Sequence, residues 1–161
     1  MSDPSFYRCV IWLLKHNEEG SMGLIMNQMG HGDVYKRLEN GEVSFPILEG
    51  GPVGQDHTFV IHTYPDLTDA TPLWQKYMAG GDVDDVLERI DNNSELWVVN
   101  GYSGWGPGQL EEEIAAKAWI VAPMNEEVIK SAPNTMWANA LKSLGNEYKS
   151  YIDAPHDISL N

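Results

Sequence analysis

The most informative stretch of this chain is residues 101–113, which read GYSGWGPGQLEEE. Four glycines and a proline lie here, between an apolar run that ends at Val99 and an expected helix start at Leu110. Glycine adopts backbone angles that other residues avoid, so we expect at least two of these glycines to have positive φ. A glycine turn between a strand and a helix can also expose backbone N–H groups to anions.

These glycines do not form a recognised phosphate-binding or hydrolase motif. No Lys-Ser or Lys-Thr pair follows them, which excludes a P-loop. The stretch lies beyond the middle of the chain, and no paired βαβ unit of the dinucleotide-binding type surrounds it. Ser103 does not fit the Gly-x-Ser-x-Gly elbow, because the second glycine comes one residue early.

Further sequence blocks on both sides of this stretch occur in a characteristic order. They are Asp3–Phe6, Val10–His16, Asn17–Gly20, Met22–Asn27, Gly50–Val53, Phe59–His62, Gly80–Asp82, Ala118–Ile120 and Ile158–Asn161. Together with residues 101–110 they resemble the AlgH/YqgE-like family of bacterial proteins over nearly the whole chain. The resemblance implies one domain over residues 1–161, a link to transcriptional regulation and no established chemistry.

Two features depart from the family pattern. Family members usually begin with a further strand ahead of the Asp3–Phe6 block, and this strand is absent before Met1. We therefore expect a sheet edge or core face that is open or is covered by another element. In addition, Gln28 and Met29 follow Asn27 where the family usually has a basic residue and a proline, so a role for that basic group is not expected here.

Length and composition fit one compact domain. At 161 residues the chain can bury a full core without disulfides or metals. The longest apolar run, Cys9–Leu14, is too short for a membrane span, and the polar start Met1–Ser5 has no basic region of a signal peptide. A single cysteine excludes a disulfide framework. We expect a cytoplasmic protein without a membrane anchor.

The charge balance is strongly acidic, with 10 basic against 24 acidic side chains and a net charge of −14. Proteins that bind nucleic acid through phosphates need clustered lysine and arginine, and Lys36-Arg37 is the only adjacent basic pair here. The composition argues against direct nucleic-acid binding. A regulatory role would then act through a protein or small-molecule partner, although solubility alone also explains the acidity.

The pattern of elements predicts an α+β fold, a single domain with mixed or antiparallel coiled sheets and several short helices. Strands are expected at residues 7–15 and 22–28, paired through the turn 17–20, and at 57–62, 95–99 and 118–121. Helices are expected after Asp33 and ending at Gly41, after Asp82, after Leu110, and after Thr135 and ending at Gly145.

The titratable side chains predict no catalytic residue, no metal site and no cofactor. His57 and His62 are five residues apart on one strand, so they point to opposite faces and cannot share a metal ion. For His16, structural hydrogen bonding is favoured over metal ligation. Cys9 lies in an apolar run that raises a thiol pKa, so we assign it to the core. The acidic residues 111–113 suit a helix N-terminus.

The candidate ligand-binding or partner-binding residues come from the glycine-containing blocks and their polar and aromatic neighbours. They are Asn27, Gly50, Gly51, Pro52, Tyr102, Trp105 and Gln109. We expect the segments that carry them to lie together on one surface, because glycine and proline turns are loops and loops often carry function. The alternative is that these glycines only allow close packing.

Two functions remain open. The first is a non-catalytic regulatory or adaptor protein that holds a protein or a small ligand. The second is a small-molecule-binding or nucleotide-binding protein, or an enzyme, with a pocket at the glycine-rich segments. A charged pair with shifted pKa values inside a pocket would favour the second. A flat aromatic patch without titratable groups would favour the first.

Overall fold

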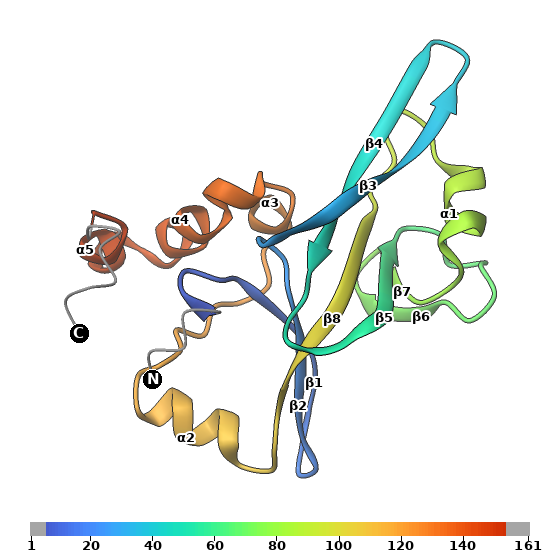
Figure 1. Ribbon diagram of the computed structural model, residues 1–161. Coiled ribbons are helices and arrows are strands. Elements are labelled where there is room, and N and C mark those ends of the chain that lie inside the picture. The colour runs from blue at the N-terminus through green and yellow to red at the C-terminus, as the bar shows by residue number, and fades with distance from the viewer. Residues whose placement is uncertain (1–5, 154–161) are drawn as a thin grey trace.

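The computed structural model describes residues 6–153 and is built around one mixed sheet (Figure 1). The sheet has eight strands in the order β1-β2-β8-β5-β7-β6, and β3 and β4 join it through the contact of β4 with β8. The strands are β1 Ile11–Asn17, β2 Gly20–Ile25, β3 Met29–Leu38, β4 Gly41–Glu49, β5 Val53–His62, β6 Thr71–Trp74, β7 Tyr77–Ala79 and β8 Trp97–Trp105.

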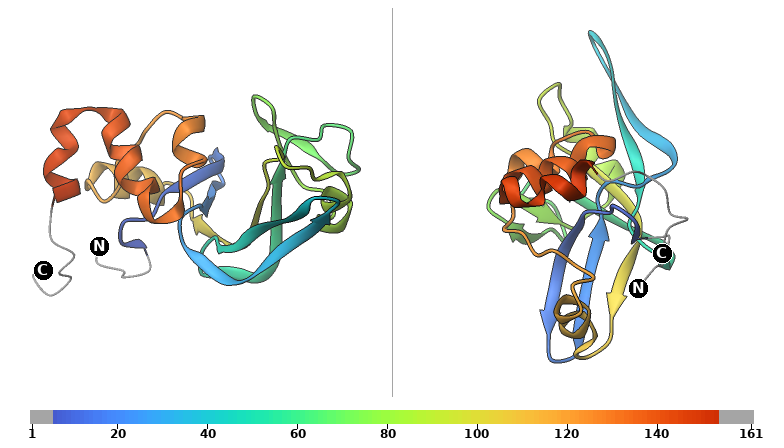
Figure 2. Two further views of the ribbon diagram at one scale, coloured as in Figure 1. Left: turned by 90° about the horizontal axis from the view of Figure 1, so that it is seen from above. Right: turned by 90° about the vertical axis from the view of Figure 1, so that its left-hand side faces the viewer.

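The helices are short and lie in three places around the sheet (Figures 1 and 2). They are α1 Val83–Arg89, α2 Gln109–Ala115, α3 Glu126–Ile129, α4 Pro133–Leu144 and α5 Lys149–Asp153. Helices α3, α4 and α5 lie together on one side, α1 lies on the other side near β6 and β7, and α2 follows the end of β8. This arrangement confirms the predicted α+β fold.

Strand β8 is the centre of the sheet. Along one edge it pairs with β5 in the antiparallel direction. Along the other edge its first half pairs with β4, with Val98–Asn100 parallel to residues 47–49, and its second half pairs with β2, with Ser103–Trp105 antiparallel to residues 21–23. Every part of β8 therefore has a strand beside it.

The core lies on both faces of β8 and β5. Val99 and Ile61 belong to a cluster that includes Trp12, Met26 and Met136, and this cluster reaches α3 and α4. Val98 and Val60 belong to a second cluster that packs against α1. Successive residues of a strand point to opposite faces, so a strand that is covered on both faces needs apolar residues at consecutive positions. Residues 96–99 form such a continuous apolar run.

Several predicted elements are confirmed. The hairpin of β1 and β2 has the expected turn, with Asn17 paired to Gly20. Helix α1 begins after Asp82, whose side chain accepts a hydrogen bond from the backbone N–H of Asp84 at 2.8 Å. Helix α2 contains Leu110, and α4 ends at Gly145 as predicted.

The helix predicted between Asp33 and Gly41 is wrong, because this segment forms the hairpin of β3 and β4. The alternating residues Val34, Lys36 and Leu38 are half-buried and their neighbours are exposed, which is the period of a strand and not of a helix. Asn40-Gly41 is a strong hairpin-turn signal, and Gly41 has a φ of +147°.

Other predicted elements also differ in their presence or their bounds. Residues 118–121 are irregular and form no strand. Helix α4 starts at Pro133, with Ala132 in the cap position, because proline suits the first helical position; the Thr135 hydroxyl instead donates to the Ala132 carbonyl at 3.0 Å. The strand predicted to end at Val99 continues as β8 to Trp105, so two glycines of the key stretch lie within a strand.

Candidate functional site

The chain crosses over β8 at the predicted glycine positions. β4 lies on one edge of β8 and β5 on the other, so the connection through Gly50 and Gly51 must pass across β8. Gly50 N–H donates to the Asn100 carbonyl at 2.8 Å, and its own carbonyl accepts from Ile25 N–H at 2.9 Å and from the Ser103 hydroxyl at 3.2 Å. This backbone crossing holds β2, β4 and β8 together.

The crossing leaves no room for side chains. A Cβ on Gly50 would overlap the Gly101 carbonyl, and a Cβ on Gly51 would overlap the Tyr102 carbonyl group. A Cβ on Gly101 would lie 2.6 Å from the Gly51 carbonyl oxygen. Gly101 has a φ of +71° and Gly108 has a φ of +73°, which confirms that at least two glycines of the stretch have positive φ.

The structure brings some of the seven predicted residues together and separates others. Gly50, Gly51 and Tyr102 meet at the crossing, and Pro52 follows them with an exposed side chain. Asn27 lies on the adjoining segment, where its amide accepts from Val10 N–H at 2.7 Å and donates to the Arg8 carbonyl at 2.9 Å. The Asn27 amide is thus used to hold the segment before β1.

Trp105 and Gln109 form a second group around Glu113, at the C-terminal end of β8. The Glu113 carboxylate accepts from the Trp105 indole at 3.1 Å, from the Trp119 indole at 2.7 Å and from the Gln109 amide at 2.9 Å. Trp105 is 8% exposed. Burial opposes ionisation of Glu113, but these three hydrogen bonds outweigh it and lower its pKa. This group fixes α2 against β8.

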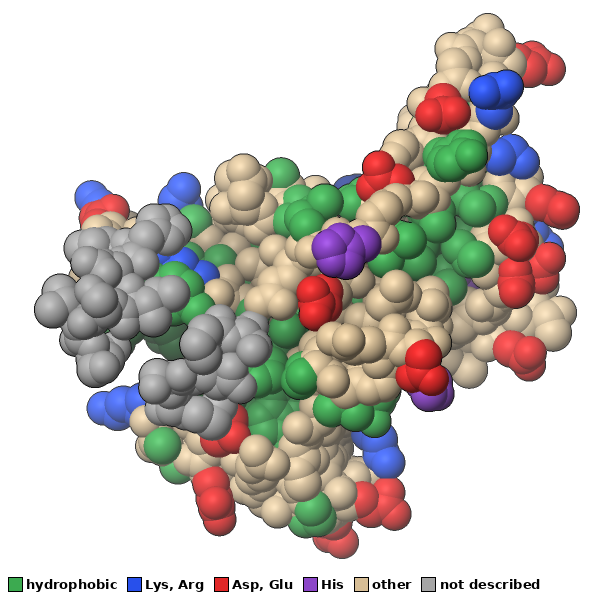
Figure 3. Space-filling model, in the orientation of Figure 1, with side chains coloured by type: hydrophobic (Ala, Val, Ile, Leu, Met, Phe, Trp, Pro, Cys, Tyr) green, Lys and Arg blue, Asp and Glu red, His purple; other side chains and the backbone are tan. Residues whose placement is uncertain are grey.

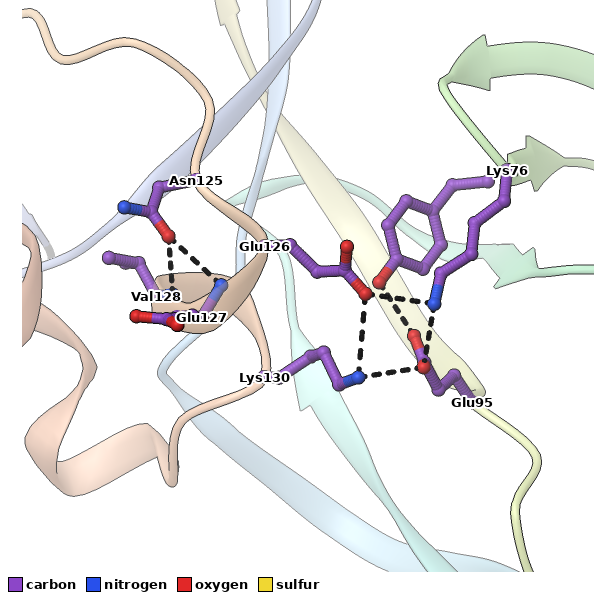
Figure 4. Close-up of polar contacts among 8 residues, drawn as sticks. Lys76, Glu95, Asn125, Glu126, Glu127, Val128 and Lys130 are labelled. Atoms are coloured by element: carbon purple, nitrogen blue, oxygen red, sulfur yellow. Dashed lines mark hydrogen bonds and ion pairs between the residues drawn. The ribbon is translucent and has the colours of Figure 1, made fainter.

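A ring of four charges joins the sheet to α3 (Figure 4). The Lys76 ammonium lies 3.0 Å from Glu95 and 2.8 Å from Glu126, and the Lys130 ammonium lies 2.8 Å from Glu95 and 3.4 Å from Glu126. The Tyr77 hydroxyl donates to the second oxygen of Glu95 at 2.6 Å. Three segments far apart in sequence therefore meet at Glu95.

The carboxylate of Glu95 is locked in its charged form. Burial would raise its pKa, but hydrogen bonds from Lys130, Tyr77 and Lys76 outweigh burial and lower the pKa to about 2. Burial is the largest cause that raises the pKa of Tyr77, and the neighbouring Glu95 and Glu126 carboxylates raise it further. A general base needs a pKa near the working pH, so Glu95 is poorly suited to proton transfer.

A cavity of about 230 Å³ lies beside this ring, between β4, the start of β8 and the junction of α3 and α4. Its apolar lining includes the fully buried Met26 and Met136 and the half-buried Phe45 and Trp97. Lys130, together with Glu95 and Ser131, supplies the polar part of the lining. The cavity is partly open to solvent and combines an apolar floor with one charged edge.

A second cavity, of about 350 Å³, lies between α3 and α4 and has a different lining. Lys142, Ser143 and Glu127 are exposed, and Val128 is the only apolar residue among those that line it. Its Asn125 side chain already accepts from the backbone N–H groups of Glu127 and Val128 (Figure 4). This cavity offers little apolar surface to a ligand.

The histidines and the cysteine have structural positions. His62 is fully buried, bonds to the Gly80 carbonyl at 3.0 Å and accepts from Tyr64 N–H at 3.1 Å, whereas His57 is exposed. His16 bonds to the Ser21 hydroxyl at 2.8 Å. Burial raises the pKa of Cys9 to about 12. Within residues 6–153 no three His, Cys, Asp or Glu side chains gather as metal ligands, and no helix has the length and apolar character needed to cross a membrane.

Comparison with known proteins decides the family. The model of the AlgH-like family matches residues 1–149. A UPF0301 protein of Chlorobium phaeobacteroides is 34% identical, with 99% of this chain and 89% of that protein covered. A UPF0301 protein of Bacteroides thetaiotaomicron is 32% identical, with 100% of this chain and 86% of that protein covered. The chain belongs to the AlgH-like family.

Two solved structures agree with this assignment. The solution structure of the AlgH protein from Pseudomonas aeruginosa has a TM-score of 0.71 at 26% identity and covers 98% of this chain and 90% of that one. The crystal structure of protein DIP2367 from Corynebacterium diphtheriae has a TM-score of 0.65 at 17% identity, covering 99% and 84%, and shares the fold. The resemblance seen in the sequence blocks is confirmed.

The sequence did not point to the four-charge ring or to the cavity beside it. Lys76, Glu95 and Glu126 come from the turn between β6 and β7, the segment before β8 and a short helix, and no spacing rule connects them. The one local signal is the pair Glu126 and Lys130, four residues apart on α3, which is ordinary for an exposed helix face.

Proposed function

We propose that this AlgH-like chain is a non-catalytic regulatory protein that binds a small ligand in the cavity beside Glu95 and Lys130. The observation that carries the proposal is an apolar cavity with a charged pair of shifted pKa at its edge. An apolar lining with a charged edge is a pattern of ligand sites, and it favours a small-molecule-binding protein over a protein adaptor. At about 230 Å³ the cavity suits a ligand of few atoms. Glu95 holds its charge and all its acceptor oxygens bind donors, which supports binding rather than catalysis.

The cavity favours a small, neutral ligand with an apolar body and one oxygen acceptor. Two lysines and two glutamates balance each other in the ring, so no net charge attracts a charged ligand. An ammonium has three N–H donors, and Glu95 and Glu126 take two of those on Lys130. The third can meet a ligand oxygen while Trp97 and Phe45 contact an aromatic or branched aliphatic body.

A titration with two matched probes tests this site. Acetophenone carries a carbonyl acceptor, and ethylbenzene has nearly the same shape without it. With methyl-labelled methionine, both probes are expected to shift the Met26 and Met136 signals saturably. Lys130→Met should weaken the binding of acetophenone about tenfold, which is the value of one hydrogen bond to a charged donor. It should leave the affinity for ethylbenzene unchanged.

The control is Lys76→Met, which removes the other lysine of the ring without touching the cavity lining. It should leave both probes bound as in the unsubstituted protein. If neither probe shifts Met26 or Met136 up to its solubility limit, the ligand site is rejected. If Lys130→Met weakens both probes equally, the carbonyl contact is rejected.

The adaptor form of the proposal uses a protein partner instead. Pro52 and Gln109 are the exposed members of the predicted residue set, and the neighbouring Val53 is 40% exposed. Gln109→Ala removes two exposed hydrogen bonds, to Gly106 and Glu113, so it should lower the melting temperature only slightly while it reduces partner recovery from a cell extract. Trp105→Ala should instead cost about 3–5 kcal/mol of stability, as truncation of a buried aromatic does. Unchanged recovery by the Gln109 variant would remove this surface from the proposal.

The regulatory role and a cytoplasmic location also belong to this proposal. The link of the family to transcriptional regulation supports the role, and a lone cysteine supports the location. The net charge of −14 supports action through a bound partner rather than through DNA contacts. Purified protein should give no salt-sensitive shift of duplex DNA at micromolar concentration, and such a shift would overturn this part.

A further inference from the structure

The outer edge of β3 is open along the part of the chain that the structure describes. β3 pairs with β4 and with no other strand, and the hairpin projects from the body (Figure 1). Three residues in alternate positions, Asp33, Tyr35 and Arg37, are exposed, and Tyr35 has 64% of its surface accessible. Open strand edges are templates for pairing with another strand.

The backbone groups of these three residues point to the open edge. Asp33 lies opposite Pro46, which has no N–H and cannot complete a hydrogen-bonded pair. Hydrogen-bonded and non-bonded pairs alternate in an antiparallel ladder, so Tyr35 opposite Ser44 and Arg37 opposite Glu42 are also non-bonded pairs. No turn or loop within residues 6–153 donates a backbone hydrogen bond to them or accepts one from them.

We propose that β3 pairs with β3 of a second copy of this chain, antiparallel, about a two-fold axis at Tyr35. In this register Tyr35 faces Tyr35 of the second copy, and Asp33 faces Arg37 of the second copy. Symmetry repeats the charge pair on the other side of the axis. All these side chains lie on one face, where opposite charges and aromatic rings directly across a ladder attract.

Only this register of β3 against itself pairs Asp33 with Arg37 on both sides of the axis. A shift by two residues along the ladder removes that pair and brings either Arg37 or Asp33 opposite Tyr35, depending on its direction. Val34 packs against the core cluster under α1, which fixes the face that β3 presents. The register shift between Met29 and Asp33 and the turn after Leu38 limit the paired segment to about residues 33–37.

A short ladder between two acidic chains gives a weak dimer. Each copy has a net charge of −14, so long-range repulsion opposes association and is screened by salt. We therefore expect a monomer–dimer equilibrium at tens of micromolar or above, at physiological ionic strength. Figure 3 shows acidic, basic and hydrophobic side chains following one another along the projecting hairpin, with no large single-sign patch. This inference does not depend on the proposed ligand site.

Sedimentation of the full chain over a range of concentrations tests the proposal. Asp33→Arg places a positive charge opposite Arg37 of the second copy, on both sides of the two-fold axis. It should weaken the dimer about tenfold. Position 33 is preferred because its partner on β4 is Pro46, whose side chain has no charge for the new arginine to attract or repel. The double swap Asp33→Arg with Arg37→Asp should restore association, because each charge again meets its opposite across the axis.

The matched control is the swap Lys15→Glu with Glu19→Lys, which exchanges an exposed ion pair at the other end of the sheet. It should leave the dimer unchanged, and thermal melting should show that all variants fold. A protein that stays monomeric at several hundred micromolar overturns the proposal. A dimer that Asp33→Arg does not weaken, or that the double swap does not restore in a folded variant, overturns this interface.

Discussion

Gly51 at the crossing and Gly41 in the projecting hairpin have the same backbone angle, a φ of +147°, in very different surroundings. A Cβ on Gly51 would overlap the Tyr102 carbonyl group and lie 2.5 Å from the Ser103 hydroxyl. A Cβ on Gly41 would have nothing within 4 Å. One glycine is required by two crossing backbones, and the other by the shape of a turn.

The two regions differ in the same way at larger scale. At the crossing, the backbones of Ile25 and Asn100 bond to Gly50, and β8 has strands along both edges. Little surface therefore remains for a partner. In the hairpin, one edge and one face are accessible, and Tyr35 is largely exposed. A cluster of glycines in a sequence can therefore mark the most tightly packed part of a fold rather than a binding loop.

The largest expected effect separates these two uses of glycine. Gly51→Ala should lower the free energy of unfolding by about 1–3 kcal/mol more than Gly41→Ala, because both variants share the backbone strain and only the first overpacks the crossing. Gly101→Ala and Gly108→Ala, with φ values of +71° and +73°, form a second matched pair with the same expected order.

Urea unfolding of the four variants measures these differences directly. Equal losses within each pair would mean that strain alone matters and that the backbones at the crossing move apart easily. Such a result would also reopen the crossing as a surface that can adapt to a ligand.

Local signals explain which elements the sequence predicts. The turn 17–20 between two apolar runs and the cap Asp82 before a periodic helix are complete within about ten residues, and both are confirmed. Asp33 also resembles a helix cap, but the Asn40-Gly41 turn signal and the alternation of residues 34–38 favour the hairpin. Tertiary pairing with β4 decides that segment.

The candidate site shows the limit of local signals more clearly. The glycine blocks 50–51 and 101–102 lie against each other, but their role as a crossing depends on β4 and β5 lying on opposite edges of β8. The ring of Lys76, Glu95 and Lys130 depends on α3 returning to the start of β8. Neither arrangement follows from residue spacing.

The smallest expected effect compares a histidine of the body with one of the hairpin. His62 is fully buried, and burial lowers its pKa below the ordinary value of 6.5. Its neutral ring suits its contacts, because one nitrogen accepts from Tyr64 N–H and the other can donate to the Gly80 carbonyl. Protonation would remove the acceptor and place a charge in the core.

The sign of the pH effect follows from this lowered pKa. Above about pH 6.5 both the folded and the unfolded chain carry neutral His62, and its contribution to stability is fully present. As the pH falls below 6.5 the unfolded chain takes up a proton first, so stability is lost until the folded ring is also protonated. Relief of the net negative charge on acidification acts in the opposite direction in every variant.

The comparison of His62→Gln with His31→Gln isolates the buried ring from that general effect. His31 lies in β3 with an exposed side chain, so its variant removes one histidine without changing the core. Between pH 6.5 and 5, above the range where ordinary carboxylates protonate, His62→Gln should lose less stability than the unsubstituted protein or His31→Gln. Parallel profiles for all three proteins in urea unfolding would show that His62 titrates alike in the folded and unfolded chain, and burial would then have no effect on its pKa.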